Sequence, residues 1–162
     1  MPSDNPVDQR IVDFIKAHHV LNLATSYRDE PWCASCFYVY QPERNSFIFT
    51  SSIASRHISD IAHNCFVAAS IVLETRTVGR IQGLQLQGLV TRVDPSELVA
   101  ARRAYIREYP YAVLSDLTLW QLDVSKLKYT DNRLGFGTKL HWSSSGDFDD
   151  LLSSLRALSP EG

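Results

Sequence analysis

Residues 46–64 read SFIFTSSIASRHISDIAHN, and this stretch organises the rest of the chain. Its first part, residues 47–50, is aromatic or β-branched and therefore favours an extended strand. The serines that follow are small hydroxyl residues that suit a turn and the N-cap of a helix. Ile58 and Ile61 then recur at helical spacing. The stretch predicts a strand, a serine-rich turn and a helix that begins at about Ser55.

The predicted start of this helix carries groups that could bind a phosphate. A helix N-terminus presents free N–H groups and a partial positive charge, which favour a bound anion. Arg56 and His57 follow Ser55 directly, and a guanidinium can hold phosphate through two parallel hydrogen bonds. The alternative is a capped surface helix whose Arg56 points into water. The residues by themselves leave both interpretations open.

The composition is that of an ordinary globular chain. Hydrophobic residues make up 44% and charged residues 21% of the 162 residues, which predicts one domain with a substantial core. A net charge of -2 gives no broad attraction to nucleic acid or anionic lipid, so neither partner is expected. No apolar run approaches the roughly 18 residues that span a bilayer. Without a secretory pattern or enough cysteines for a disulfide scaffold, we expect a cytoplasmic protein.

Apolar periodicity divides the chain into strands that are joined mostly by short turns. The expected strands are 20–26, 32–40, 46–50, 65–73, 80–94 and 117–130, the last interrupted near 123–126. The expected helices are 6–19, 55–64, 95–109 and 148–158, with Pro6 and Pro95 at first helical positions. Six strands, with helices in some of the connections between them, predict an α+β β-barrel. We treat residues 1–162 as one domain, with a core over about 7–142 and a C-terminal extension over 143–162.

Cys33 and Cys36 form a CxxC motif, a spacing that serves redox chemistry or zinc binding elsewhere. The motif lies inside the predicted strand 32–40, where side chains three residues apart point to opposite faces. The two thiols are therefore expected to stay apart, and we expect neither a disulfide nor a metal site.

Gln85 and Gln87 share one face of the predicted strand 80–94, while Leu84, Leu86 and Val90 share the other. Two neighbouring amides on an otherwise apolar strand must be solvated or must hydrogen-bond a partner. Water is one such partner, and the edge of a heterocycle with donors and acceptors is another.

The order of these segments resembles a known superfamily. PWCASCFYVY, SFIFTSSIASRHISDIAHNCFVAAS and IQGLQLQGLVTRV are similar to the flavin-binding split barrels of pyridoxamine 5'-phosphate oxidase. The stretch KYTDNRLGFGTK resembles the small YhbP-type proteins within that group. The resemblance implies a six-stranded antiparallel split β-barrel with flanking helices. It also implies a homodimer that binds FMN between its subunits.

The resemblance further implies a set of cofactor-binding residues. Positions that match Thr50, Ser51, Ser55 and Arg56 hold the phosphate, while the strand that carries Trp32 and Ala34 lines the isoalloxazine. Gln85 or Gln87 approaches the edge of the ring. Apart from the resemblance, we expect Lys139 in the glycine-containing turn to bind the phosphate if Arg56 does not. Many members have lysine at the helix start, where this chain has Arg56-His57.

Three functional hypotheses follow. The first is an FMN-dependent oxidoreductase with an unknown small-molecule substrate, in which the flavin supplies the redox chemistry and no catalytic residue is assigned. The second is a non-enzymatic binding module for flavin, haem or another anionic ligand. For haem, the candidate axial ligands are His57, His63 and His141. The third is a dimeric scaffold with an empty site.

Overall fold

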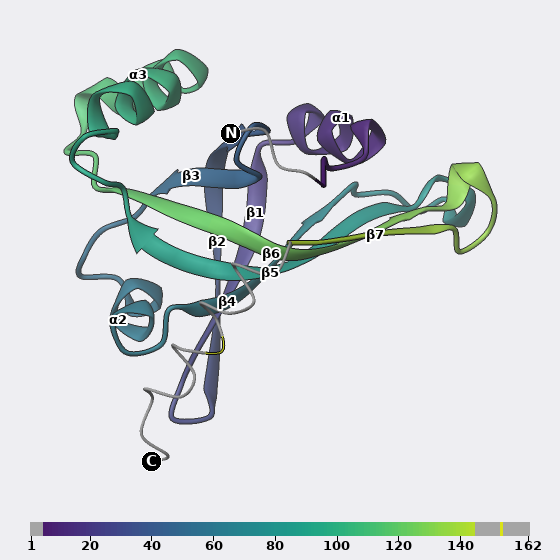
Figure 1. Ribbon diagram of the computed structural model, residues 1–162, viewed down its shortest axis with the longest axis horizontal. Coiled ribbons are helices and arrows are strands. Elements are labelled where there is room, and N and C mark those ends of the chain that lie inside the picture. The colour runs from purple at the N-terminus through teal and green to yellow at the C-terminus, as the bar shows by residue number, and fades with distance from the viewer. Residues whose placement is uncertain (1–4, 145–152, 154–162) are drawn as a thin grey trace.

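The computed structural model describes residues 5–144 and 153, and within them the chain forms seven strands and three α-helices (Figure 1). The α-helices are α1 Gln9–Ala17, α2 Arg56–His63 and α3 Leu98–Glu108. The strands are β1 Val20–Tyr27, β2 Glu30–Gln41, β3 Ser46–Thr50, β4 Phe66–Val72, β5 Gln82–Arg92, β6 Leu119–Asp131 and β7 Lys139–Ser143. The α+β class is therefore as predicted. The short helix expected at 148–158, in the C-terminal extension, lies outside the described residues.

The strands form one antiparallel sheet in the order β3-β2-β1-β4-β5-β6-β7. An additional pairing between β3 and the first half of β6 closes six of these strands into a barrel, which confirms the six-stranded barrel. The seventh strand, β7, was not predicted. It pairs with the second half of β6 and extends an arm away from the barrel, formed by β5, β6 and β7 (Figure 1).

The interruption predicted near 123–126 is a bulge within a continuous strand. Gln87 pairs with Lys126 and Gly88 pairs with Val124, so Ser125 is an extra residue on β6. The hydroxyl of Ser125 donates to the Gln87 carbonyl at 3.1 Å, which stabilises the extra residue. Such a bulge increases the local bend that a closed barrel needs. It lies where β6 changes partner from β3 to β7.

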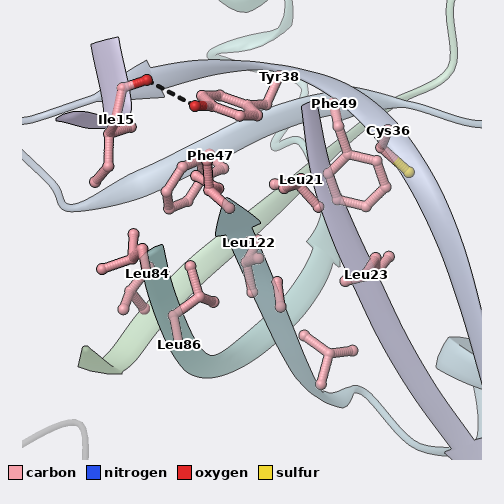
Figure 2. Close-up of a cluster of buried hydrophobic side chains, with 14 of the residues drawn as sticks. Ile15, Leu21, Leu23, Cys36, Tyr38, Phe47, Phe49, Leu84, Leu86 and Leu122 are labelled. Carbon is pink, nitrogen blue, oxygen red and sulfur yellow. Dashed lines mark hydrogen bonds between the residues drawn. The ribbon is translucent and has the colours of Figure 1, made fainter. Parts of the chain in front are cut away.

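The core lies inside the barrel and consists of side chains from every wall (Figure 2). Leu21, Leu23, Phe47 and Phe49 are completely buried there. The inward residues of each strand recur at every second position, as the period of a strand requires. Helix α1 closes one end of the core through Ile11 and Ile15, and the Tyr38 hydroxyl donates to the Ile15 carbonyl at 2.6 Å (Figure 2).

A second, smaller cluster holds α3 against the barrel. Ile48, Leu119 and Tyr105 pack in it, and the Tyr109 hydroxyl donates to the Tyr38 carbonyl at 2.5 Å. The predicted start of this helix at Pro95 was wrong. The Asp94 carboxylate accepts a hydrogen bond from the Ser96 N–H at 2.8 Å and forms a separate turn, so α3 begins three residues later.

The first helix also begins later than predicted, at Gln9 instead of Pro6. Asp8 is its N-cap, and its carboxylate accepts from the Arg10 N–H at 2.9 Å.

Strand alternation places Cys33 at the surface and Cys36 in the core, on opposite faces of β2 as predicted. Among the described residues, the helices are too short and too polar to cross a bilayer.

Candidate functional site

The turn between β3 and α2 is built by serine hydroxyls. Ser55 occupies the N-cap position of α2 as predicted, but its hydroxyl donates to the Ser52 carbonyl at 2.7 Å. No side chain therefore caps the first turn of α2. The N–H groups of that turn are orphan donors in any helix, and here they lie beside a run of hydroxyls. The beginning of α2 can accept an anion without displacing a protein cap.

His57 joins two of these hydroxyls. Its Nε2 contacts the Ser51 hydroxyl in a short hydrogen bond and lies 3.4 Å from the Ser55 hydroxyl. The two hydroxyls are 3.3 Å apart. Burial lowers the pKa of His57, and the nearby Asp60 carboxylate opposes this shift. The cluster of Ser51, Ser55 and His57 therefore offers neutral donors and a weakly basic imidazole in one place.

Arg56 is held in position by an aromatic ring and two carboxylates. Its guanidinium carbon lies 4.5 Å from the centroid of the Trp32 ring, which is a cation–π contact. Glu30 and Asp60 approach the guanidinium at 3.5 and 3.9 Å. Asp60 is buried and accepts a hydrogen bond from Thr25 at 2.9 Å, so this carboxylate is fixed by the core. The arginine is oriented before any ligand binds.

Gln85 and Gln87 project from the outer face of β5, away from the barrel core. In the sheet register, Gln87 aligns with Ala68 of β4, and Ala68 aligns with Ala24 of β1. Cys33 of β2 continues the same row. Three small side chains therefore lie next to one amide, and they form a flat strip that can support a planar ring.

A pocket of about 500 Å³ lies over this strip. Its lining includes Ala24, Ser26, Asn64, Gln87 and Lys126. The Asn64 side chain donates to the Ser26 carbonyl at 3.1 Å, so the end of α2 is fixed against β1. The volume falls in the range of small-molecule and cofactor sites.

The predicted cofactor residues fall into two groups within the chain. Thr50, Ser51, Ser55 and Arg56 gather at the beginning of α2, and Trp32 joins them through its contact with Arg56. Ala34 follows Trp32 on the same inward row of β2, opposite Leu23. Gln85 and Gln87 lie on the outer face.

Lys139 lies at the start of β7 and pairs with Thr130, two residues along β7 from His141, which shares a cross-strand row with Gln85. Sequence reasoning did not select Lys126 and Lys128, which stand beside the glutamines. The sequence shows that Lys126 and Lys128 lie two residues apart on one strand, but it does not show that this strand pairs with β5.

The three histidines considered as haem ligands are also separated. His63 stacks on Tyr27 with ring centroids 4.3 Å apart, and its Nδ1 bonds the Ser59 carbonyl at 2.9 Å. His141 lies on β7, opposite Lys128. Among residues 5–144 and 153, no three His, Cys, Asp or Glu side chains are grouped as a metal site would require.

The chain is similar in sequence to UPF0306 proteins of Yersinia. UPF0306 protein YpAngola_A4021 of Yersinia pestis bv. Antiqua (strain Angola) is 36% identical over 141 residues, which span 86% of this chain and 96% of that protein. This chain belongs to the UPF0306 family. No protein-family model matches it.

Solved structures place this UPF0306 chain among the split barrels. A heme binding protein from Mycobacterium smegmatis aligns with a TM-score of 0.68 and 22% identity, over 80% of this chain and 55% of that one. A FAD-binding protein from Mesorhizobium loti aligns with a TM-score of 0.62 and 10% identity, over 74% and 88%. The fold is that of the pyridoxamine 5'-phosphate oxidase-like split barrel, as the sequence predicted.

Proposed function

We propose that this UPF0306 chain is a flavin-binding protein that uses FMN as the cofactor of a small-molecule oxidoreductase. The observation that supports it best is Arg56 at the uncapped beginning of α2, held by its contact with Trp32 and preceded in the chain by the turn that carries the Ser51 and Ser55 hydroxyls. These groups suit a phosphate monoester, because a guanidinium, hydroxyls and helix N–H groups all donate to its oxygens. The Mesorhizobium loti structure with the same fold is a FAD-binding protein, which agrees with a flavin.

The residues present also fit the ring of a flavin. The flat strip of Cys33, Ala24 and Ala68 leaves room for a planar heterocycle, and Gln87 at its end can hydrogen-bond a ring edge. When bound, the flavin would supply hydride and electron transfer. The protein would hold the phosphate through Arg56, orient the ring over the strip and limit the access of water.

The two groups of residues lie on different faces of one sheet, and this supports a homodimer. A single ligand contacts both groups most simply where two protomers meet, with the phosphate group from one and the glutamines from the other. The exposed apolar side chains Phe37 (56% exposed) and Val72 (58% exposed) also lie on the outer face, where an interface would cover them. Light scattering at micromolar concentration tests this, and a stable monomer would contradict the shared site.

Titration with FMN, FAD and riboflavin tests the cofactor. We expect FMN to bind most tightly, because its terminal phosphate is a monoester with three free oxygens, whereas both phosphates of FAD are bridged and riboflavin has no phosphate. Equal affinity for FMN and riboflavin would contradict the phosphate site. Flavin fluorescence quenching reports binding directly.

Haem is the second candidate ligand, because the Mycobacterium smegmatis structure with the same fold is a heme binding protein. His63 suits an axial ligand: its Nδ1 faces the Ser59 carbonyl, which leaves Nε2 available to a metal. The absorption spectrum of purified protein distinguishes the candidates. Flavin bands support the first function and a Soret band supports the second, while a colourless protein that binds neither would leave only a scaffold.

A further inference from the structure

A second pocket, of about 540 Å³, lies on the outer face of the arm formed by β5, β6 and β7. Its polar lining comes from all three strands and from the N-terminal segment: Asn5, Gln85, Gln87, Lys126, Lys128, His141 and Ser143. It shares Gln87 and Lys126 with the pocket over the flat strip. The two pockets are therefore adjacent along one face of the sheet.

The register of the sheet fixes how these side chains converge. Gln85, Lys128 and His141 form one cross-strand row. The neighbouring row, two residues along each strand, consists of Gln87, Lys126 and Ser143. Residues two apart on a strand share a face and are separated by roughly 7 Å, so Lys126 and Lys128 are neighbours. Each lysine is thus flanked in the sheet by a glutamine on β5 and a polar residue on β7.

The charged side chains that line this pocket are all positive. Its lining contains two lysines and no carboxylate, although the chain has a net charge of -2. Within the described part of the chain, Lys126 and Lys128 form no ion pair, whereas Arg10, Arg44, Arg56 and Arg133 all do. Like charges on neighbouring positions of a sheet destabilise it, and an anion between them would reverse that effect.

The wall of the pocket is fixed by the N-terminal segment. The Asn5 side chain donates to the Ser143 carbonyl at 2.8 Å, and the Trp142 indole donates to the Asn5 carbonyl at 2.7 Å. These two bonds hold residue 5 against β7, beside His141. The pocket is thus bounded by hydrogen-bonded backbone and does not depend on the lysine side chains for its shape.

We propose that this pocket binds the phosphate or carboxylate group of a small organic anion, with Lys126 and Lys128 as its cationic ligands. Gln85 and Gln87 supply N–H donors beside them. Because the pocket adjoins the flat strip, the anion belongs to a molecule that lies next to the flavin ring, which makes it the substrate or the electron donor. That last assignment rests on the function proposed above, but the binding of the anion does not.

The test uses the full chain without added flavin. Isotope-labelled protein is titrated with inorganic pyrophosphate and, separately, with succinate, while backbone amide signals are followed by NMR. We expect saturable shifts confined to β5, β6 and β7 around Gln85, Lys126 and His141. A response to pyrophosphate alone identifies a phosphate ligand, and a response to succinate alone identifies a carboxylate ligand. Responses to both support a general anion pocket.

Lys126→Gln and Lys128→Gln remove the charge and keep a shorter, polar and uncharged side chain at each position. Each should weaken binding about tenfold, because a charge-assisted contact is lost. Lys16→Gln removes the same charge from an exposed position on α1 and should leave the affinity within about twofold. The unperturbed spectrum of each variant establishes that it is folded.

The proposal is overturned if neither anion shifts these signals at about 10 mM, or if Lys16→Gln weakens binding as much as the two pocket variants do. The second result would indicate diffuse surface electrostatics. Failure of this test leaves the FMN titration unaffected, and failure of FMN binding leaves the anion pocket intact, so the two proposals are judged separately.

Discussion

The guanidinium of Arg56 lies over the indole of Trp32, 4.5 Å from the ring centroid, and so links the beginning of α2 to β2. An arginine that is stacked on an aromatic ring loses less conformational freedom when it binds a ligand than one that moves freely in water. Stacking engages the face of the guanidinium and leaves its N–H groups directed outward in the plane, where Glu30 and Asp60 now lie at 3.5 and 3.9 Å and where an anion would bind. This single contact joins two residues that the sequence had assigned to different parts of the cofactor site.

Replacement of Arg56 tests the phosphate site directly. Arg56→Ala should weaken FMN binding roughly tenfold to a hundredfold, because one charge-assisted pair to phosphate is lost. Riboflavin binding should change little. Arg28→Ala is the matched control, since Arg28 is a hairpin arginine that lies over the Tyr27 ring at 5.1 Å. Equal losses for FMN and riboflavin would instead assign Arg56 to the ring pocket, and no loss for FMN would favour Lys139 as the phosphate ligand.

Glu30 competes with the ligand for Arg56. Its carboxylate lies 3.5 Å from the guanidinium and is largely exposed, so the pair itself contributes little to stability. Glu30→Gln should raise the affinity for FMN about twofold to fivefold, because a negative charge beside the phosphate disappears. Asp29→Asn, a change to the adjacent acid in the same turn, serves as the control in fluorescence titrations. A loss of FMN affinity in Glu30→Gln would show that the carboxylate positions Arg56 instead of competing for it.

The lowered pKa of His57 makes the stability of the folded chain depend on pH. Burial lowers the pKa of this imidazole in the folded chain, so the unfolded chain binds the proton more readily. The contribution of neutral His57 is complete above the unfolded pKa of about 6.5 and is lost as pH falls below it. Urea unfolding at pH 8 and pH 5.5, at one protein concentration, should show a smaller decrease for His57→Gln than for wild type. An identical decrease would contradict the buried, neutral state.

The barrel could be predicted from sequence because its strands are local patterns. Alternation in 20–26 and 32–40, and the aromatic run at 47–50, specify strands without any knowledge of their partners. The missed strand β7 has only five residues, none of them fully buried, so it carries little apolar signal. Its formation depends on pairing with β6, which is a tertiary effect.

The candidate site, which stays a prediction, could be located only where its residues are neighbours in the sequence. The serine turn and Arg56 are contiguous in sequence, so their chemistry could be recognised. Lys126 and Lys128 can be recognised as candidate site residues only from the strand register, which places them beside Gln87 and Gln85. The contact between Trp32 and Arg56 likewise needs α2 to pack against β1 and β2, and no local pattern encodes it.

The two cysteines of the CxxC motif should differ in reactivity. Cys33 is exposed, whereas Cys36 is buried and burial raises the pKa of its thiol to about 11. In the native protein an aromatic disulfide reagent should label Cys33 rapidly and Cys36 slowly. Cys33→Ala should therefore remove the rapid phase, and Cys36→Ala should keep it. Three free thiols are expected after unfolding without reductant; a missing pair or stoichiometric zinc would contradict the assignment.

Gly88 has the least space of the glycines on β5. A Cβ built there would lie 2.2 Å from the Asp123 carbonyl oxygen and 2.9 Å from Leu122 Cδ1. The oxygen belongs to backbone next to the bulge, so it cannot move without disturbing the pairing that closes the barrel. Gly88→Ala should therefore lower the free energy of unfolding by about 3 kcal/mol or more.

Gly83 provides the matched control on the same strand. A Cβ there would meet only the Ile71 carbonyl oxygen, at an ordinary 3.7 Å. Gly83→Ala should change the free energy of unfolding by less than about 1 kcal/mol, with a bias towards stabilisation, because alanine restricts the unfolded chain. Urea unfolding of both variants at equal protein concentration measures the contrast. Equal effects of the two substitutions would mean that β5 and β6 do not cross as closely at the bulge as the structure has them.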